Sequence, residues 1–179
     1  MKGKTQNLKK YNAAYYFLVN NSISTVAELE ERVNALSSQT GELLSKMNAN
    51  TTRAKQLQDM INLGTNAQRL QPLIEEMNAI HWKGTRDKFR ANHKADIDLY
   101  YTSKRVLKAN HGVTKIDLPS WEKEQKSLRQ QDEELSAQYK SIRKTLDQLL
   151  NVRRCVEATK KEIEREISAK SKDIQRYGI

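Results

Sequence analysis

Histidine, cysteine and tyrosine are the residue types in this chain that could support metal binding or nucleophilic chemistry. The three histidines are His81, His93 and His111. Intervals of 12 and 18 residues separate them, so none is paired with a second histidine close by on one helical face, as a metal site requires. Cys155 follows Arg154 in a helical pattern, with no glycine-rich phosphate loop, nucleophile elbow or Cys–His arrangement elsewhere. Tyr100 and Tyr101 could attack a phosphodiester, but the sequence lacks the metal ligands for that reaction. We therefore expect no enzymatic activity, no metal and no cofactor.

Residues 81–116 combine basic side chains with aromatic rings. The segment holds nine Lys and Arg residues against three Asp residues, with Trp82, Phe89, Tyr100 and Tyr101 between them. Lysine and arginine neutralise phosphates and aromatic rings stack on bases, so this composition is typical of a nucleic-acid surface. The candidate binding residues are Lys83, Arg86, Lys88, Arg90, Lys94, Lys104, Arg105 and Lys108. The alternative is a solvated helix face over a small core that holds Phe89 and one or both tyrosines.

A second basic stretch lies closer to the C-terminus. Its candidate binding residues are Lys140, Arg143, Lys144, Arg153 and Arg154. Their helical spacing would let them follow the backbone of a duplex. The same positions could instead flank a coiled-coil seam and pair with Glu28, Glu30 and Glu31, which is the more usual role of such charges.

Composition narrows the class of protein. The 179 residues carry a formal net charge of +10, which favours polyanionic partners. Only 6 Gly and 2 Pro are present, which disfavours a fold built from many tight turns between strands. No apolar run approaches the ~18 residues of a spanning helix and no signal segment opens the chain, so we expect a cytoplasmic protein without membrane contact. One cysteine excludes an internal disulfide within a single chain.

Two long heptad seams predict the fold. The first comprises Val26, Leu29, Val33, Leu36, Thr40, Leu43, Met47, Asn50, Ala54, Leu57 and Ile61. The second comprises Leu128, Leu135, Ile142, Leu149, Val156 and Ile163, and a row four residues further on that includes Tyr139, Leu146, Ile167 and Ile174 and is interrupted by Arg153. Each spans 36 residues, or ~54 Å of helix, so an antiparallel hairpin should bury both. In that hairpin Val26 lies near Ile163 and Ile61 near Leu128, and the polar positions Asn50 and Arg153 fix the register.

The sequence therefore predicts an all-α protein: a long antiparallel coiled-coil hairpin with a small helical subdomain at its tip, all in one domain (1–179). A short helix occupies residues 1–24, and Thr25 and Glu28 form the capping box of a coiled-coil helix over 25–63 that Gly64 ends. The basic helical tip covers 64–118, with its last helix ending at His111 and Gly112. Pro119 and the N-cap Ser120 start the second coiled-coil helix, over 119–177.

Several stretches resemble one protein family. These are NLKKYNAAYYFLVNNSISTVAELEERVNALSSQ, RDKFRANHKADIDLYYTSKRVLKANHGVTKIDLPSWEKEQKSL and YKSIRKTLDQLLNVRRCVEAT. They are similar to the C-terminal helical region of relaxases, the mobilisation proteins of conjugative elements of Firmicutes, over residues 7 to about 157. The nuclease segment of that family is missing here. The resemblance implies a non-catalytic helical module, either an excised domain or a free-standing protein, that contacts DNA or other transfer proteins.

Three functions stay open at this point. The first is a nucleic-acid-binding accessory of conjugative transfer, with DNA or a nucleoprotein as partner. The second is an inhibitor, encoded by a mobile element, that binds a host defence nuclease such as an RNA-guided effector. The third is a plain coiled-coil scaffold. None of them takes a small-molecule substrate, and each is compatible with a homo-oligomer.

Overall fold

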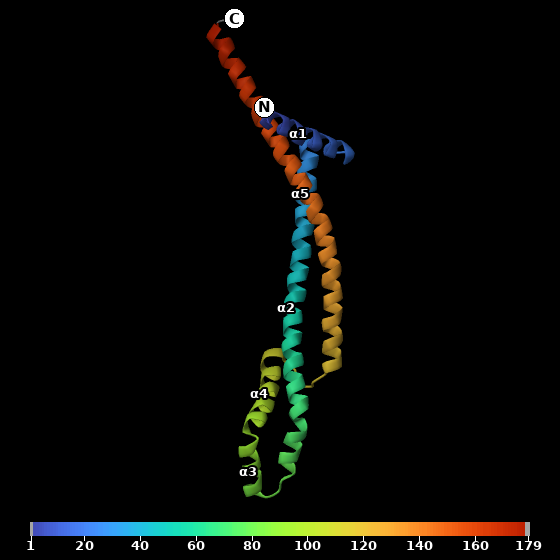
Figure 1. The fold of residues 1–179 in the computed structure, drawn as a ribbon, viewed down its shortest axis with the longest axis vertical. Coiled ribbons are helices and arrows are strands. Elements are labelled where there is room, and N and C mark those ends of the chain that lie inside the picture. Colours follow the sequence, from blue (N-terminus) through green and yellow to red (C-terminus); the bar gives the residue numbers. More distant parts are fainter. Residues whose placement is uncertain (1, 178–179) are drawn as a thin grey trace. The chain divides into compact units, whose positions relative to one another are not determined.

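The computed structural model describes the backbone of residues 2–177 and the side chains of residues 9–171. The described backbone forms helices α1 (Lys2–Asn20), α2 (Val26–Ala79), α3 (Lys83–Asn92), α4 (Lys94–His111) and α5 (Leu118–Tyr177), without a strand (Figure 1). The all-α prediction is confirmed. Contacts divide the chain into a terminal unit, Met1–Leu44 with Ser136–Ile179, and a central unit, Ser45–Leu135. Helices α2 and α5 contribute to both units.

The start of α2 follows from its capping box. The Glu28 amide donates to Thr25 Oγ1 (3.1 Å), while the amides of Ser24 and Thr25 donate to Glu28 Oε2 (2.7 and 3.2 Å). These bonds satisfy amides that have no partner within the helix. The predicted beginning of this helix is therefore confirmed.

The terminal unit is built by α1, the first part of α2 and the second part of α5. Its buried core is formed by Ala14, Ile23, Leu29, Val33, Leu146, Leu149 and Val152. Leu29 and Val33 come from the first predicted seam, and Leu149 comes from the second, so the seams do bury apolar surface against each other. Helix α1 adds Ala14, with Phe17 and Leu18 packed at the margin of the core.

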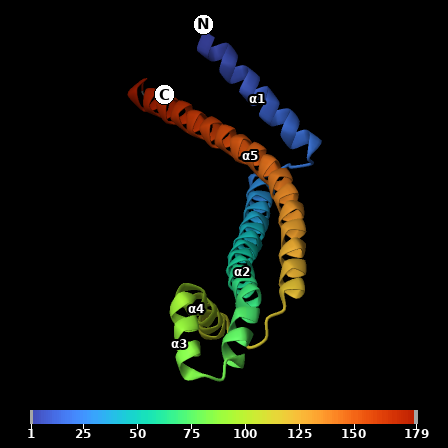
Figure 2. The same ribbon diagram turned by 60° about the horizontal axis from the view of Figure 1, so that its bottom comes forward.

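The central unit places α3 and α4 beside the second part of α2 (Figure 2). One core cluster joins Ala67, Leu70, Ile74 and Met77 of α2 to Ile97 and Tyr100 of α4. A second cluster joins Leu57 and Met60 of α2 to Leu107 of α4 and Trp121 of α5. The two clusters hold α4 along α2, and they leave the opposite side of α4 exposed.

The predicted end of the first long helix at Gly64 is wrong, because α2 continues without interruption to Ala79. A Cβ atom at Gly64 would lie 2.8 Å from Leu118 Cδ2 and 2.9 Å from Trp121 Cζ3. The glycine therefore allows a close approach of the chain around the start of α5 rather than ending a helix. Pro72 also lies inside α2, and the exposed surface around it lets water satisfy the carbonyl that its missing N–H leaves free.

The N-cap predicted for the last helix is also wrong. Helix α5 begins at Leu118, and Asp117 Oδ1 accepts a hydrogen bond from the Ser120 amide (3.2 Å). Aspartate is as good an N-cap as serine, so Asp117 fills this role one position before the helix starts. Pro119 lies in the first turn, where it lacks no necessary donor.

The register predicted for the long helices differs from the observed one by about one heptad. Pairing Val26 with Ile163 would place Glu30 opposite residue 159, yet in the terminal unit Glu30 contacts Arg153 (3.3 Å). In the central unit Ile61 and Leu128 pack against one core cluster, but Asn50 contacts Asp132 rather than the expected residue 139. Ile163 therefore lies past the first residue of α2, and its side chain is 51% exposed.

Candidate nucleic-acid interface

Helices α3 and α4 position the basic segment of the central unit. Phe89 of α3 packs against the core cluster, and the chain bends at His93 (φ −113°) before α4 begins. Helix α4 ends at Gly112 in the left-handed conformation (φ 64°), as predicted. The Gly112 and Val113 amides donate to the Lys108 and Leu107 carbonyls (3.2 and 3.1 Å), which closes the last turn.

The exposed side of α4 carries most of its charge. Ile97, Tyr100, Ser103 and Leu107 are buried, Asp96, Val106 and His111 are half-buried, and the other positions of the helix are exposed. One exposed stripe, at intervals of three and four, consists of Lys94, Asp98, Tyr101, Arg105 and Lys108. We call Lys94, Arg105 and Lys108 the α4 cations. Three positive charges on one helix face, against one carboxylate, form a cationic strip along the helix.

Helix α3 adds three exposed cations, Lys83, Lys88 and Arg90. Among the described side chains, every ion pair lies outside residues 81–116: the pairs join Arg53 to Glu124, Arg143 to Asp147, and Arg153 to Glu30 and Glu157. No cation of α3 or α4 is therefore paired with a carboxylate among the described side chains. The charge of these cations is available to an anionic partner.

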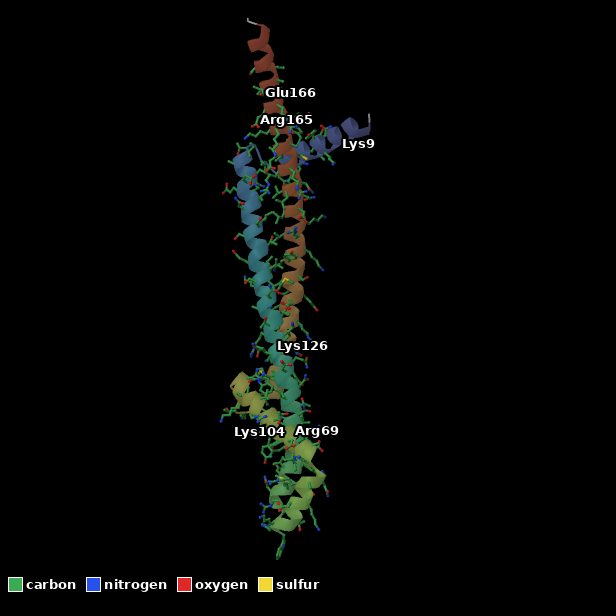
Figure 3. All side chains as sticks on the ribbon, turned by 90° about the vertical axis from the view of Figure 1, so that its left-hand side faces the viewer. Lys9, Arg69, Lys104, Lys126, Arg165 and Glu166 are labelled. Atoms are coloured by element: carbon green, nitrogen blue, oxygen red, sulfur yellow. The ribbon has the colours of Figure 1, made fainter. Side chains whose placement is uncertain are left out.

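Two of the predicted binding residues make internal contacts instead. Arg86 is half-buried, and its guanidinium donates to the carbonyls of Ile80 (2.9 Å) and His81 (3.4 Å), which follow the end of α2. Lys104 donates to the Tyr100 hydroxyl (3.3 Å), and its Nζ lies 5.4 Å from the centre of that ring. Figure 3 shows Lys104 on α4. Both side chains form hydrogen bonds within the fold, although neither has a carboxylate partner, so we leave them out of the candidate contact residues.

The four aromatic residues of the segment divide into two groups. Phe89 and Tyr100 belong to the core, and the Tyr100 hydroxyl donates to Gln71 Oε1 (2.6 Å). Tyr101 is 51% exposed and Trp82 is 82% exposed. The expectation that Phe89 and one or both tyrosines belong to the core is confirmed for Tyr100, which is buried, whereas Phe89 is half-buried and packs against the cluster. The two exposed rings were not among the predicted binding residues. Trp82 could have been recognised by its position between helical patterns, outside any apolar stripe.

Two of the candidate cations of α5 form ion pairs within the terminal unit. Arg143 pairs with Asp147 (3.1 Å), and Arg153 pairs with Glu30 (3.3 Å). The predicted pairing of this stretch with acidic residues of the first long helix is therefore confirmed at Arg153. Arg154 donates to Asn151 Oδ1 (3.2 Å). Two further candidates, Lys140 and Lys144, are exposed.

An apolar groove of about 680 Å³ also lies in the terminal unit. Its apolar lining comes from α1, the start of α2 and α5, and includes Tyr15, Leu18, Val26, Val156 and Ile163. Val26 and Ile163, which the seams predict to lie near each other, both line this groove rather than a closed core.

Within side chains 9–171, no three His, Cys, Asp or Glu residues come together as metal ligands. No helix between residues 2 and 177 has both the length and the apolar character needed to cross a bilayer.

Comparison of the chain with protein-family models, with curated proteins and with solved structures gives no match. The resemblance to the C-terminal region of relaxases therefore stays a prediction from the sequence.

Proposed function

We propose that the chain binds nucleic acid through the exposed cations of α3 and α4. The observation that carries this proposal is that α3 and α4 present six exposed cations, apart from Lys104 with its contact to Tyr100, and that none of the six has a carboxylate partner among the described side chains. They are Lys83, Lys88, Arg90, Lys94, Arg105 and Lys108. An unneutralised set of this kind attracts phosphates, and the counterions that the phosphates release on binding supply the free energy.

The biological setting of this proposal rests on the resemblance to relaxases. Binding of DNA by a non-catalytic helical protein would suit an accessory of conjugative transfer. The same cations could instead bind a host defence nuclease, but that use requires an acidic protein surface rather than free nucleic acid. The scaffold alternative requires no role for the cations at all.

The test compares two triple variants that each remove three positive charges. In the first, Lys94, Arg105 and Lys108 of α4 are replaced by Gln. In the matched control, Lys140, Lys144 and Arg154 of α5 are replaced by Gln. We expect the α4 variant to bind a labelled DNA oligonucleotide more weakly. The slope of log K against log salt should become shallower by about 0.9 for each duplex phosphate that is no longer neutralised, or by about 0.7 for each phosphate of a single strand.

Each result discriminates between the functions. Equal weakening in both variants would show that net charge, rather than this surface, drives binding. Weaker DNA binding by the control variant alone would place the interface in the terminal unit. A wild-type chain that binds no oligonucleotide even at low salt would overturn the proposal. Retention of an effector nuclease by that chain would then favour the inhibitor function.

A further inference from the structure

Trp82 is the most exposed large apolar residue among the described side chains, at 82%. It lies in the short connection between α2 and α3, where the backbone is extended (φ −78°, ψ 121°). Burying an indole ring is favourable, and an exposed ring does not contribute that free energy to the fold. By contrast, the other tryptophan of the chain, Trp121, is only 8% exposed and belongs to the core.

The backbone that carries Trp82 is held in place from the following helix. The Arg86 amide donates to the Trp82 carbonyl (3.0 Å). The Arg86 guanidinium also donates to the carbonyls of Ile80 and His81, just before the tryptophan. The exposed ring therefore stands on an ordered connection, and little backbone entropy would be lost when a planar ligand covers it.

The ring is also free of aromatic partners. Stacking and edge contacts among the described side chains join Tyr15 to Tyr16, Phe89 to His93, and Tyr100 to Tyr101, and none includes Trp82. Tyr101, the other exposed ring of the segment, lies edge-on to Tyr100 with centroids 5.2 Å apart. Trp82 is thus the ring with the most accessible face in this segment.

Exposed cations follow Trp82 along the chain. Lys83 follows it directly and is exposed. At Gly84, two residues after Trp82, no atom beyond the glycine's chain neighbours and its own helix backbone lies within 4 Å of the position that a Cβ would take. Lys88 follows on the same helix and is exposed. An exposed aromatic ring on a segment that also carries free cations is the combination by which proteins hold single strands, because bases stack while lysines contact the backbone.

We propose that Trp82 stacks on an unpaired base, so that this surface takes single-stranded nucleic acid in preference to a duplex. The inference rests on the proposed function, since the cations of α3 and α4 supply the phosphate contacts. A duplex offers these cations its phosphates, but its bases are already stacked on one another. Only a strand with a free base face can use both the cations and the ring.

The first measurement uses the intrinsic fluorescence of Trp82. In a Trp121→Phe variant, Trp82 is the sole tryptophan and reports directly on its own surroundings. Titration with a thymidine oligonucleotide should quench its emission. The same strand paired with its complement should leave the emission nearly unchanged at equal saturation. Quenching of equal size by the duplex would overturn the inference.

The second measurement leaves the core intact. Trp82→Leu keeps an apolar side chain but removes the stacking plane. We expect Trp82→Leu to weaken single-strand binding about 5- to 150-fold, as measured by the fluorescence anisotropy of a labelled strand. Duplex binding should stay within about twofold of the wild type. Tyr15→Leu, which removes another exposed ring (63%) from the terminal unit, is the matched control and should change neither affinity.

The outcomes separate this inference from the proposed function. If both strands bind with equal affinity and Trp82→Leu changes neither, stacking is overturned while nucleic-acid binding stands. If neither strand binds to the wild type, the proposed function fails and the inference fails with it. A single-strand preference that Trp82→Leu abolishes supports both.

Discussion

Asn50 of α2 and Asp132 of α5 form a hydrogen bond of 2.9 Å, Nδ2 to Oδ1, across the paired helices of the central unit. Asn50 belongs to the first heptad seam, and all other members of that seam except Thr40 are apolar. A polar residue at such a position adds little stability, but it is satisfied in one alignment of the helices only. This bond therefore selects one register among those that the apolar rows allow.

A disulfide test can distinguish the observed register from the alternative one heptad away. In a Cys155→Ala background, we expect cysteines at positions 50 and 132 to form an intramolecular disulfide under mild oxidation. Cysteines at 50 and 139 should not, because seven residues along a helix correspond to about 10.5 Å. The two pairs are compared by their mobility on non-reducing gels. Faster closure of the 50/139 pair would contradict the register.

The seams show why helices could be predicted and their alignment could not. Spacings of three and four identify α2 and α5 because one apolar face of a helix recurs at that period. A shift of seven residues preserves the facing rows, so the pattern alone does not choose among registers. The choice depends on single polar contacts, Asn50 with Asp132 and Glu30 with Arg153. Such contacts can be recognised only once the helices are placed.

The candidate site, like the helix register, could be predicted only in part from the sequence. The basic character of residues 81–116 is visible in the composition, but the role of each cation depends on what lies beside it. Arg86 and Lys104 form hydrogen bonds within the fold, although they resemble Lys88 and Arg105 in having no carboxylate partner in the described chain. Sequence reasoning assigned the same role to all four because charge alone does not reveal a partner.

Gly64 and Gly41 both lie inside α2, and they should respond oppositely to alanine. A Cβ at Gly41 would meet no atom within 4 Å, so Gly41→Ala gains the helix propensity of alanine, about 0.5–1 kcal/mol. At Gly64 the Cβ would press against Leu118 and Trp121, and such overpacking typically costs about 1–3 kcal/mol. Thermal denaturation should show a higher Tm for Gly41→Ala and a lower one for Gly64→Ala. An increase in both would mean that Gly64 serves no close approach.

The ion pair between Arg53 and Glu124 predicts a pH-dependent contribution to stability. Arg53 Nε and Nη2 donate to the two Glu124 oxygens (2.8 and 3.1 Å), and these hydrogen bonds, with the positive charge, lower the pKa of Glu124. A carboxyl whose pKa is lowered by folding stabilises the protein above its unfolded pKa, about 4.3. That contribution is lost as the pH falls through the lower, folded pKa. Since both side chains are about two-fifths exposed, solvent limits it to about 1 kcal/mol or less.

Chemical denaturation of Glu124→Gln at two pH values tests this contribution. The variant should be less stable than the wild type at pH 7, and the difference should shrink towards pH 3 and in 1 M salt. Glu122→Gln, on the same exposed helix turn and without an ion pair in the described chain, should match the wild type throughout. A Glu124→Gln deficit that persists unchanged at pH 3 would assign the effect to packing instead.

Arg86 and Lys88 lie two residues apart on α3, yet their replacement by Gln should have different consequences. Arg86→Gln removes the guanidinium that binds the carbonyls of Ile80 and His81, and a hydrogen bond to a charged group contributes about 1.5–3 kcal/mol. Partial exposure of Arg86 reduces that figure, so we expect a loss of about 1 kcal/mol in urea denaturation. Lys88→Gln removes an exposed charge without a carboxylate partner in the described chain and should leave stability unchanged. In the salt titration Lys88→Gln should flatten the slope of DNA binding. A stability loss in Lys88→Gln that equals that of Arg86→Gln would contradict the separation of structural from free cations on this helix.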